Sequence, residues 1–216
     1  MKTCPVHARR CWEGAGAAGF LLLLLLGALA VGVTSVPSGD ATAAEIARFF
    51  TDHRQGHILN MSLATLGAFF FYPAFVAMLY NALRQAEGEG GIYATLALIG
   101  GVGLLPPLLV QAVAWGTAAA PEEIAPAVAD ALFDFGNLAF TIALFPIALT
   151  VGASSIVGLQ TTVLPRWLSM SGVAFAVIFV LVGVAVPGLL GAPVFFLFGL
   201  WMLLVSALLL RKARHT

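Results

Sequence analysis

The sequence predicts an all-α polytopic membrane protein, built as one bundle of six transmembrane helices with an amphipathic helix on its outer side. Only 9% of the 216 residues are charged and 61% are hydrophobic, whereas a typical globular chain has about 25% charged residues. The charges also separate five charge-free runs, at residues 14–39, 55–83, 90–121, 135–165 and 167–210. A helix that crosses a bilayer needs about 20 apolar residues. The first four runs therefore hold one span each, and the last, with 44 residues, holds two.

The distribution of lysine and arginine predicts that both termini face the cytoplasm. In that orientation eight basic residues lie inside and only Arg48 and Arg54 lie outside, which is the bias that the positive-inside rule describes for short loops. The eight are Lys2, Arg9, Arg10, Arg84, Arg166, Arg211, Lys212 and Arg214. The expected organisation is a cytoplasmic tail at 1–13, a single transmembrane domain at 14–210 and a second cytoplasmic tail at 211–216.

The first expected span, residues 14–36, is open to a second interpretation. A basic start, an apolar stretch and Ala28-Leu29-Ala30 also resemble a secretory signal with a cleavage site, and cleavage would leave five spans. The apolar run is longer than the roughly 7–15 residues usual for such a signal. A retained span is therefore the prediction.

Cys4 and Cys11, the two cysteines of the chain, precede this span together with His7. A zinc site usually has four ligands, and only Glu13 is close enough in sequence to be a fourth. Reducing conditions in the cytoplasm disfavour a disulfide. We therefore expect a simple tail or a site of lipid attachment beside the membrane.

Residues 42–55 are expected to form the amphipathic helix on the outer membrane surface. Thr42 and Glu45 have the spacing of a capping box, in which two side chains satisfy free backbone N–H groups at a helix start. Apolar and aromatic residues then recur with helical spacing, as is typical of helices that lie in the interface. They are Ile46, Phe49, Phe50, His53 and His57. Gly56 marks the expected bend into the second span.

The remaining spans are expected at residues 57–79, 92–115, 129–156, 167–186 and 194–210. The second contains Pro73, the third Pro106-Pro107 and the fourth Pro146. Proline removes a backbone donor and kinks a helix, which a membrane tolerates only where neighbouring groups satisfy the freed carbonyls. We therefore expect three kinked spans.

Polar side chains are expected to gather at the outer starts of the second and fourth spans. His53, His57 and Asn60 stand at i, i+4 and i+7, and Asp130, Asp134 and Asn137 repeat that spacing. The predicted polar cluster comprises Arg54, His57, Asn60, Gln111, Asp134 and Asn137. Asp134 is its centre, because an ionisable group within a span is a functional hypothesis by default. We expect Asp134 to face the bundle interior and to contact His57 or Arg54.

Three hypotheses account for this cluster. The first is a structural ion pair that docks the amphipathic helix. The second is the site of a small-solute or proton-coupled carrier, in which carboxylates and imidazoles exchange protons. The third is a metal site built from His53, His57, Asp130 and Asp134, whose residue types suit several metal ions.

No Ser-His-Asp order, nucleophile elbow or phosphate-binding loop occurs in the sequence, so it predicts no catalytic residue and no cofactor. Zero net charge gives no electrostatic case for a nucleic-acid partner. The lipid bilayer is the expected surrounding, and a protein partner is left open. The predicted function is thus a non-catalytic accessory or sensing subunit, with a carrier as the first alternative and a metal-dependent membrane enzyme as the second.

Three short segments, residues 49–54, 83–88 and 164–168, carry a resemblance to a known group. They read FFTDHR, LRQAEG and LPRWL. In these segments the chain resembles uncharacterised six-span integral membrane proteins of bacteria that are grouped by a domain of unknown function. The resemblance extends over nearly the whole chain. It implies six spans and a bacterial cell membrane, and it implies no activity and no site residue.

Overall fold

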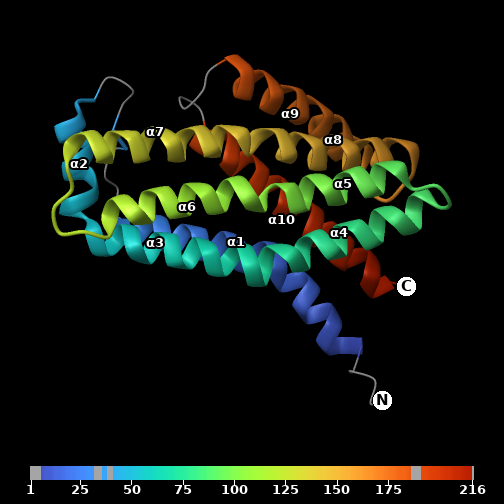
Figure 1. The fold of residues 1–216 in the computed structure, drawn as a ribbon. Helices are drawn as coiled ribbons and strands as arrows, with labels where there is room; N and C mark the ends of the chain where they lie inside the picture. Colours follow the sequence, from blue (N-terminus) through green and yellow to red (C-terminus); the bar gives the residue numbers. More distant parts are fainter. Residues whose placement is uncertain (1–5, 32–35, 38–40, 186–190, 216) are drawn as a thin grey trace.

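The computed structural model describes residues 6–31, 36–37, 41–185 and 191–215, which form a bundle of helices without strands (Figure 1). The helices in chain order are α1 (Val6–Val31), α2 (Ala43–Asp52), α3 (Arg54–Leu66), the π-helical turn η1 (Gly67–Phe71), α4 (Tyr72–Glu87), α5 (Ile92–Gly103), α6 (Leu105–Ala119), α7 (Pro126–Ile142), α8 (Leu144–Gln160), α9 (Arg166–Ala185) and α10 (Gly191–His215).

Within this part of the chain, five helices are long and apolar enough to cross a membrane. They are Arg54–Glu87, Ile92–Ala119, Pro126–Gln160, Arg166–Ala185 and Phe195–Lys212. The all-α class and the presence of several apolar helices of spanning length are thereby confirmed. The apolar segment of α1, Gly16–Val31, is shorter than these five.

Three of the long helices are interrupted just ahead of a proline, as the sequence predicted. The turn η1 precedes Pro73, the break at Leu104 precedes Pro106-Pro107, and the break at Ala143 precedes Pro146. The pyrrolidine ring lacks a donor and clashes with the carbonyl four residues earlier. This geometry accounts for the position of each interruption.

Small residues allow α1 to approach its neighbours closely. A Cβ atom on Gly16 would lie 2.7 Å from the backbone nitrogen of Phe75, and one on Gly56 of α3 would collide with the carbonyl of Ala30. Glycines at such contacts let helix backbones touch. The side of α1 that faces α3, η1 and α4 is thus a tight backbone contact.

The main core surrounds α8, which packs on α5 and α9. Its largest fully buried side chains include Tyr72, Phe75, Phe179 and Trp201. Where α8 meets α9, a Cβ on Gly152 would lie 3.2 Å from that of Ala176, so this contact also depends on small residues.

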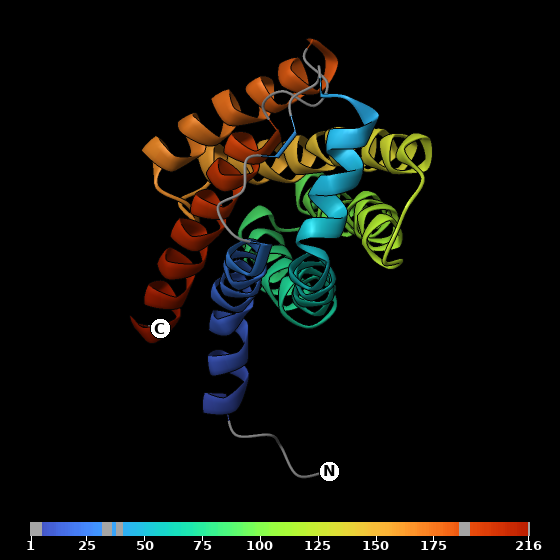
Figure 2. The same cartoon turned by 90° about the vertical axis from the view of Figure 1, so that its left-hand side faces the viewer.

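Helix α2 lies across one end of the bundle, and Figure 2 views the molecule from that end. The predicted capping box is confirmed: Glu45 N donates to Thr42 Oγ1 at 3.4 Å, and Thr42 N donates to Glu45 Oε2 at 2.7 Å. The helix ends at Asp52, and His53 lies between it and α3. The expected bend at Gly56 is therefore wrong, because Gly56 lies inside α3 and packs on α1.

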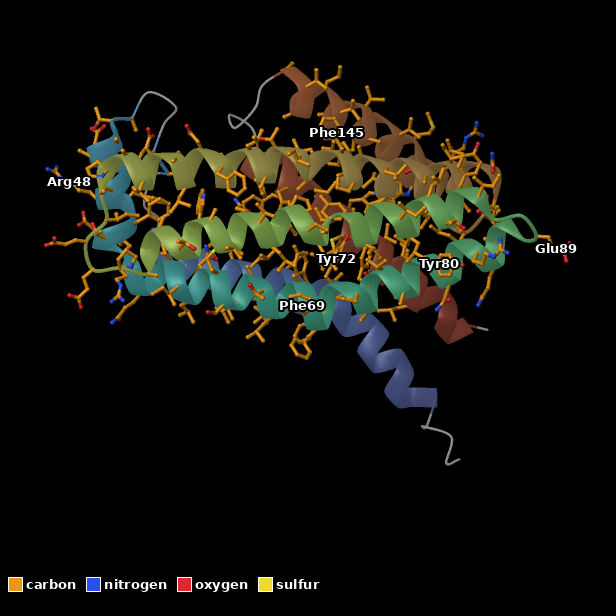
Figure 3. The ribbon with its side chains drawn as sticks, viewed as in Figure 1. Arg48, Phe69, Tyr72, Tyr80, Glu89 and Phe145 are labelled. Carbon is orange, nitrogen blue, oxygen red and sulfur yellow. The ribbon has the colours of Figure 1, made fainter. Side chains whose placement is uncertain are left out.

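The opposite end of the bundle holds the α4–α5 turn with Glu89, whereas Arg48 of α2 lies at the first end (Figure 3). Helix α1 begins and α10 ends toward the same side as the α4–α5 turn (Figure 1). There Lys212 Nζ donates to the carbonyls of Thr162 and Val163. This contact ties the end of α10 to the α8–α9 loop.

Candidate functional site

Arg54 is the first residue of α3, and its guanidinium contacts the C-terminal end of α6. Nε donates to the carbonyls of Ala119 at 3.2 Å and of Ala120 at 3.0 Å, and Nη2 donates to Ala120 at 2.6 Å. The last carbonyls of a helix have no partner within it, and they carry the negative end of the helix dipole. Arg54 therefore caps α6.

His57 stands one helical turn further along α3 and is fully buried. Its Nε2 lies 3.0 Å from the carbonyl oxygen of Phe49. A carbonyl can only accept, so Nε2 carries the proton. Phe49 is among the last four residues of α2, whose carbonyls lack partners within the helix. His57 therefore caps α2.

We call Arg54 and His57 the helix-end pair. Between them they hold the C-terminal ends of α2 and α6 against the start of α3. Arg54 uses its positive charge for this, and His57 uses one N–H group. His57 Nδ1 has no hydrogen-bond partner among the described residues.

Four aromatic rings cluster at this end of the bundle, and two of them, Phe49 and Phe50, pack against His57. The imidazole centroid lies 4.5 Å from that of Phe49 and 5.2 Å from that of Phe50. Trp115 stacks on Phe133 at 5.6 Å with an interplanar angle of 14°, and both lie within 6.3 Å of Phe49 and Phe50. The sequence showed the aromatic face of α2 but did not predict that Trp115 of α6 and Phe133 of α7 complete this buried cluster.

Asp134 does not lie inside the bundle, so the expectation that it faces the interior is wrong. The side chain is exposed, and it makes no ion pair with any residue that the structure describes. The physical reason is the rotation of about 100° between successive helical residues. Phe133 is buried against Trp115, and this turns the next residue outward.

The other residues of the predicted cluster are dispersed. Asn60 faces α1, where a Cβ on Gly27 would collide with its Oδ1. Asn137 is half-buried on α7, and Gln111 lines a cavity deeper in the bundle. The six predicted residues therefore do not form one site.

The four candidate metal ligands are not brought together either. His57 is buried, Asp130 is half-buried, and His53 and Asp134 are exposed. In the described part of the chain, no group of three or more His, Cys, Asp and Glu side chains could hold a metal ion.

A cavity of about 80 Å³ lies where the interrupted helices meet. Side chains of α1, α3, α6, α7 and α10 line it together with Ala68 of η1. The lining is apolar except for Thr65 and Gln111, and the Thr65 hydroxyl donates to the Met61 carbonyl at 2.8 Å. Gln111 is therefore the polar group that the lining can offer to a ligand.

A row of buried hydroxyls lies along α8, and α9 and α10 contribute one more each; the sequence did not predict them. Its members are Thr150, Ser154, Ser155, Ser169 and Ser206. Thr150 and Ser154 donate to carbonyls of their own helix at 2.9 and 2.6 Å. A hydroxyl needs an adjacent base to become a nucleophile, and no carboxylate is buried among the described residues. This row therefore serves helix packing, and the signal for it was the Thr-x3-Ser-Ser spacing.

No family model matches this chain, and neither a curated protein nor a solved structure matches it. Its function is therefore inferred from the geometry.

Proposed function

We propose that the chain is a non-catalytic, six-span protein of a bacterial cell membrane that acts as an accessory or sensing subunit of a larger membrane assembly. The observation that supports this most directly is the use of the polar residues at the α2 end. Arg54 and His57 cap helices, while Asp134 faces outward. Among the described residues, the side chains that could perform chemistry do not converge.

The sixth span of this proposal is α1. Its apolar part, Gly16–Val31, extends over about 24 Å at 1.5 Å per residue, and the apolar run of the sequence continues to residue 36, which gives the predicted span enough residues for a hydrocarbon core of about 30 Å. Its close glycine contacts with α3 and α4 support a helix that belongs to the bundle. The positive-inside bias supports cytoplasmic termini.

The subunit proposal is tested by comparing the size of the assembly in native membranes with that of the purified protein. Mild detergent extracts of the native membrane are separated by native electrophoresis. We expect a band well above the size of the 22.5 kDa chain, whereas the purified protein should run as a smaller species. If both samples have the same size, the protein is not a stable subunit and the proposal is wrong.

A small-solute carrier is the second candidate, and the cavity is the observation in its favour. Discontinuous helices that meet near the middle of a membrane often line transport sites, and Leu108 and Leu109 of the lining follow Pro106-Pro107 directly. The test is a solute-flux assay on the purified protein in sealed vesicles. Ala112→Leu should block a genuine flux by filling the cavity, and the matched change Ala131→Leu on the exposed side of α7 should leave the flux unchanged. This pair of results would make the carrier the first candidate.

A metal-dependent membrane enzyme remains the third candidate. The dispersal of His53, His57, Asp130 and Asp134 gives it no support from the described residues. Titration of the purified protein with Zn²⁺ tests it directly. Stoichiometric binding of Zn²⁺ that is lost in His57→Phe would support this candidate.

A further inference from the structure

The outward side of α7 is an apolar stripe that contains one carboxylate. Ala131, Asp134, Leu138 and Ile142 follow one another at helical spacing, and all four are exposed. Leu138 is 53% exposed and Ile142 49%. Phe135, beside Asp134, is 56% exposed. We call these five residues the α7 face.

Asp134 belongs to an apolar helix that is long enough to span the membrane. It is the ninth residue of Pro126–Gln160, about 12 Å from the start of that helix at 1.5 Å per residue. It also follows directly after Phe133, which stacks on Trp115 one turn inside the end of α6. The whole helix has 35 residues and is about 52 Å long, so a hydrocarbon core of about 30 Å centred on it places Asp134 at the edge of that core. Ionisable residues within membrane-spanning segments are rare and almost always pair or face a water-filled cavity.

The described residues supply no basic partner for this carboxylate at the α2 end. Arg54 is engaged by the carbonyls of α6 and His57 by that of α2. Arg48 and His53 are exposed, and neither forms an ion pair with Asp134 among the described residues. The segments 32–40 and 186–194, which fall outside or at the edge of the described residues, contain no lysine, arginine or histidine.

The neighbourhood of Asp134 suits a second helix. Ala127 and Ala131 lie on the same exposed side of α7, and small side chains let helices approach closely within a membrane. Leu138 and Ile142 extend the contact with branched apolar side chains. A helix that packs on this side would cover the carboxylate in apolar surroundings. That helix therefore needs a basic group to compensate the charge of Asp134.

We propose that the α7 face docks a transmembrane helix of a different membrane protein, and that this helix carries an arginine or lysine at the depth of Asp134. The proposal rests on the proposed function as a subunit and identifies the surface and the chemistry of the partner. A second copy of this chain and a lipid are the two other occupants that the experiment distinguishes.

The experiment is photo-crosslinking in native membranes, with p-benzoylphenylalanine in place of Phe135. The matched control carries the same probe in place of Phe196 of α10, which is 67% exposed. We expect one protein adduct from position 135 that position 196 does not give. The crosslinked peptide of the partner should be an apolar segment that contains an arginine or lysine.

Asp134 is then tested with that probe in place. Asp134→Asn should lower the adduct yield at least tenfold, and Asp134→Glu, which keeps the charge, should retain most of it. Asp52→Asn, which removes an exposed carboxylate from α2 at the same end, should leave the yield unchanged.

The purified Asp134→Asn protein should melt at the same temperature as the wild type, because the side chain is exposed. A lower melting temperature assigns Asp134 an internal structural role and overturns the proposal.

Three crosslinking results would also overturn it: an adduct that Asp134→Asn leaves intact, an adduct with a second copy of the chain, or adducts with lipid alone. If native electrophoresis nevertheless shows a large assembly that Asp134→Asn does not change, the subunit proposal stands and only the docking surface is wrong. If the wild type forms no assembly, both fall together.

Discussion

Arg54 and His57 stand three residues apart on α3 and contact the ends of two different helices. A histidine and an arginine near a membrane surface are common candidates for a ligand or proton site. Here the hydrogen bonds to Ala119, Ala120 and Phe49 give both side chains a structural role. The carbonyls at helix ends must find partners wherever water is scarce.

Arg54→Met should destabilise the protein by about 1–3 kcal/mol, because it removes charged hydrogen bonds from two carbonyls at the end of α6. The measurement is an unfolding titration in mixed micelles. Arg48→Met is the control, since Arg48 is exposed on α2, and a surface change of this kind should stay within about 0.5 kcal/mol. Equal effects of the two changes would contradict a capping role for Arg54.

His57→Phe should cost about 1–3 kcal/mol, because the ring contacts can remain while the Phe49 carbonyl loses its donor. His57→Ala should cost more, because it also leaves a cavity beside Phe49 and Phe50. The same unfolding titration measures both variants. If His57→Phe is as stable as the wild type, the hydrogen bond to Phe49 contributes nothing.

At the scale of elements, the long helices are organised by two local features. Prolines interrupt three of them near the middle, and glycines set how closely α1 approaches α3 and α4. The interruption η1 borders the cavity through Ala68, whereas the glycine contacts lie on the side of α1 that faces α3 and α4. The same bundle therefore has one loosely filled region and one tight contact.

Gly56→Ala should destabilise the protein by about 1–3 kcal/mol, because the added methyl group collides with backbone that cannot move without shifting α1. Gly116→Ala is the matched control on α6, where the nearest atom to the new Cβ would be 3.9 Å away. Alanine is favoured over glycine within a helix by roughly 0.5–1 kcal/mol, so this control should be neutral or more stable. Thermal unfolding of both purified variants measures the difference, and a stable Gly56→Ala protein would refute the close contact.

At the scale of the whole molecule, the two ends of the bundle differ in charge. The described end near α2 carries several carboxylates, including Asp52, Glu122 and Glu123. The opposite end carries Arg84, Arg166, Arg211 and Lys212, together with Glu87 and Glu89. This difference supports the proposal that the second end faces the cytoplasm.

Single cysteines at Glu89 and Glu123 should report opposite sides of the membrane. Cys4 and Cys11 are first replaced by serine so that each variant carries one thiol. A membrane-impermeant maleimide applied to intact cells should label Glu123→Cys, and it should reach Glu89→Cys only after permeabilisation. Labelling of both thiols in intact cells would show that the helix count between them is wrong.

The sequence alone determined the class of this protein, the approximate extent of its long helices, the three interruptions and the capping box of α2. Each of these depends on composition or on residues close together in the chain. The share of charged residues indicates whether a chain is surrounded by water or by lipid. Proline acts on the carbonyl four residues earlier, and Thr42 reaches only to Glu45. Such effects do not require knowledge of which helices are neighbours.

The tertiary structure decided which side of each helix faces inward. The spacing of Asp130, Asp134 and Asn137 is compatible with any rotation of α7, and the burial of Phe133 against Trp115 selects the one that exposes Asp134. In a chain with this many apolar residues, the helix sides that contact lipid and those that contact the core both carry apolar side chains. The hydrophobicity of a residue therefore does not show which way its side chain faces. The caps on α2 and α6 depend on the same packing, because Arg54 lies 65 residues from Ala119 in sequence and meets it only in the folded bundle.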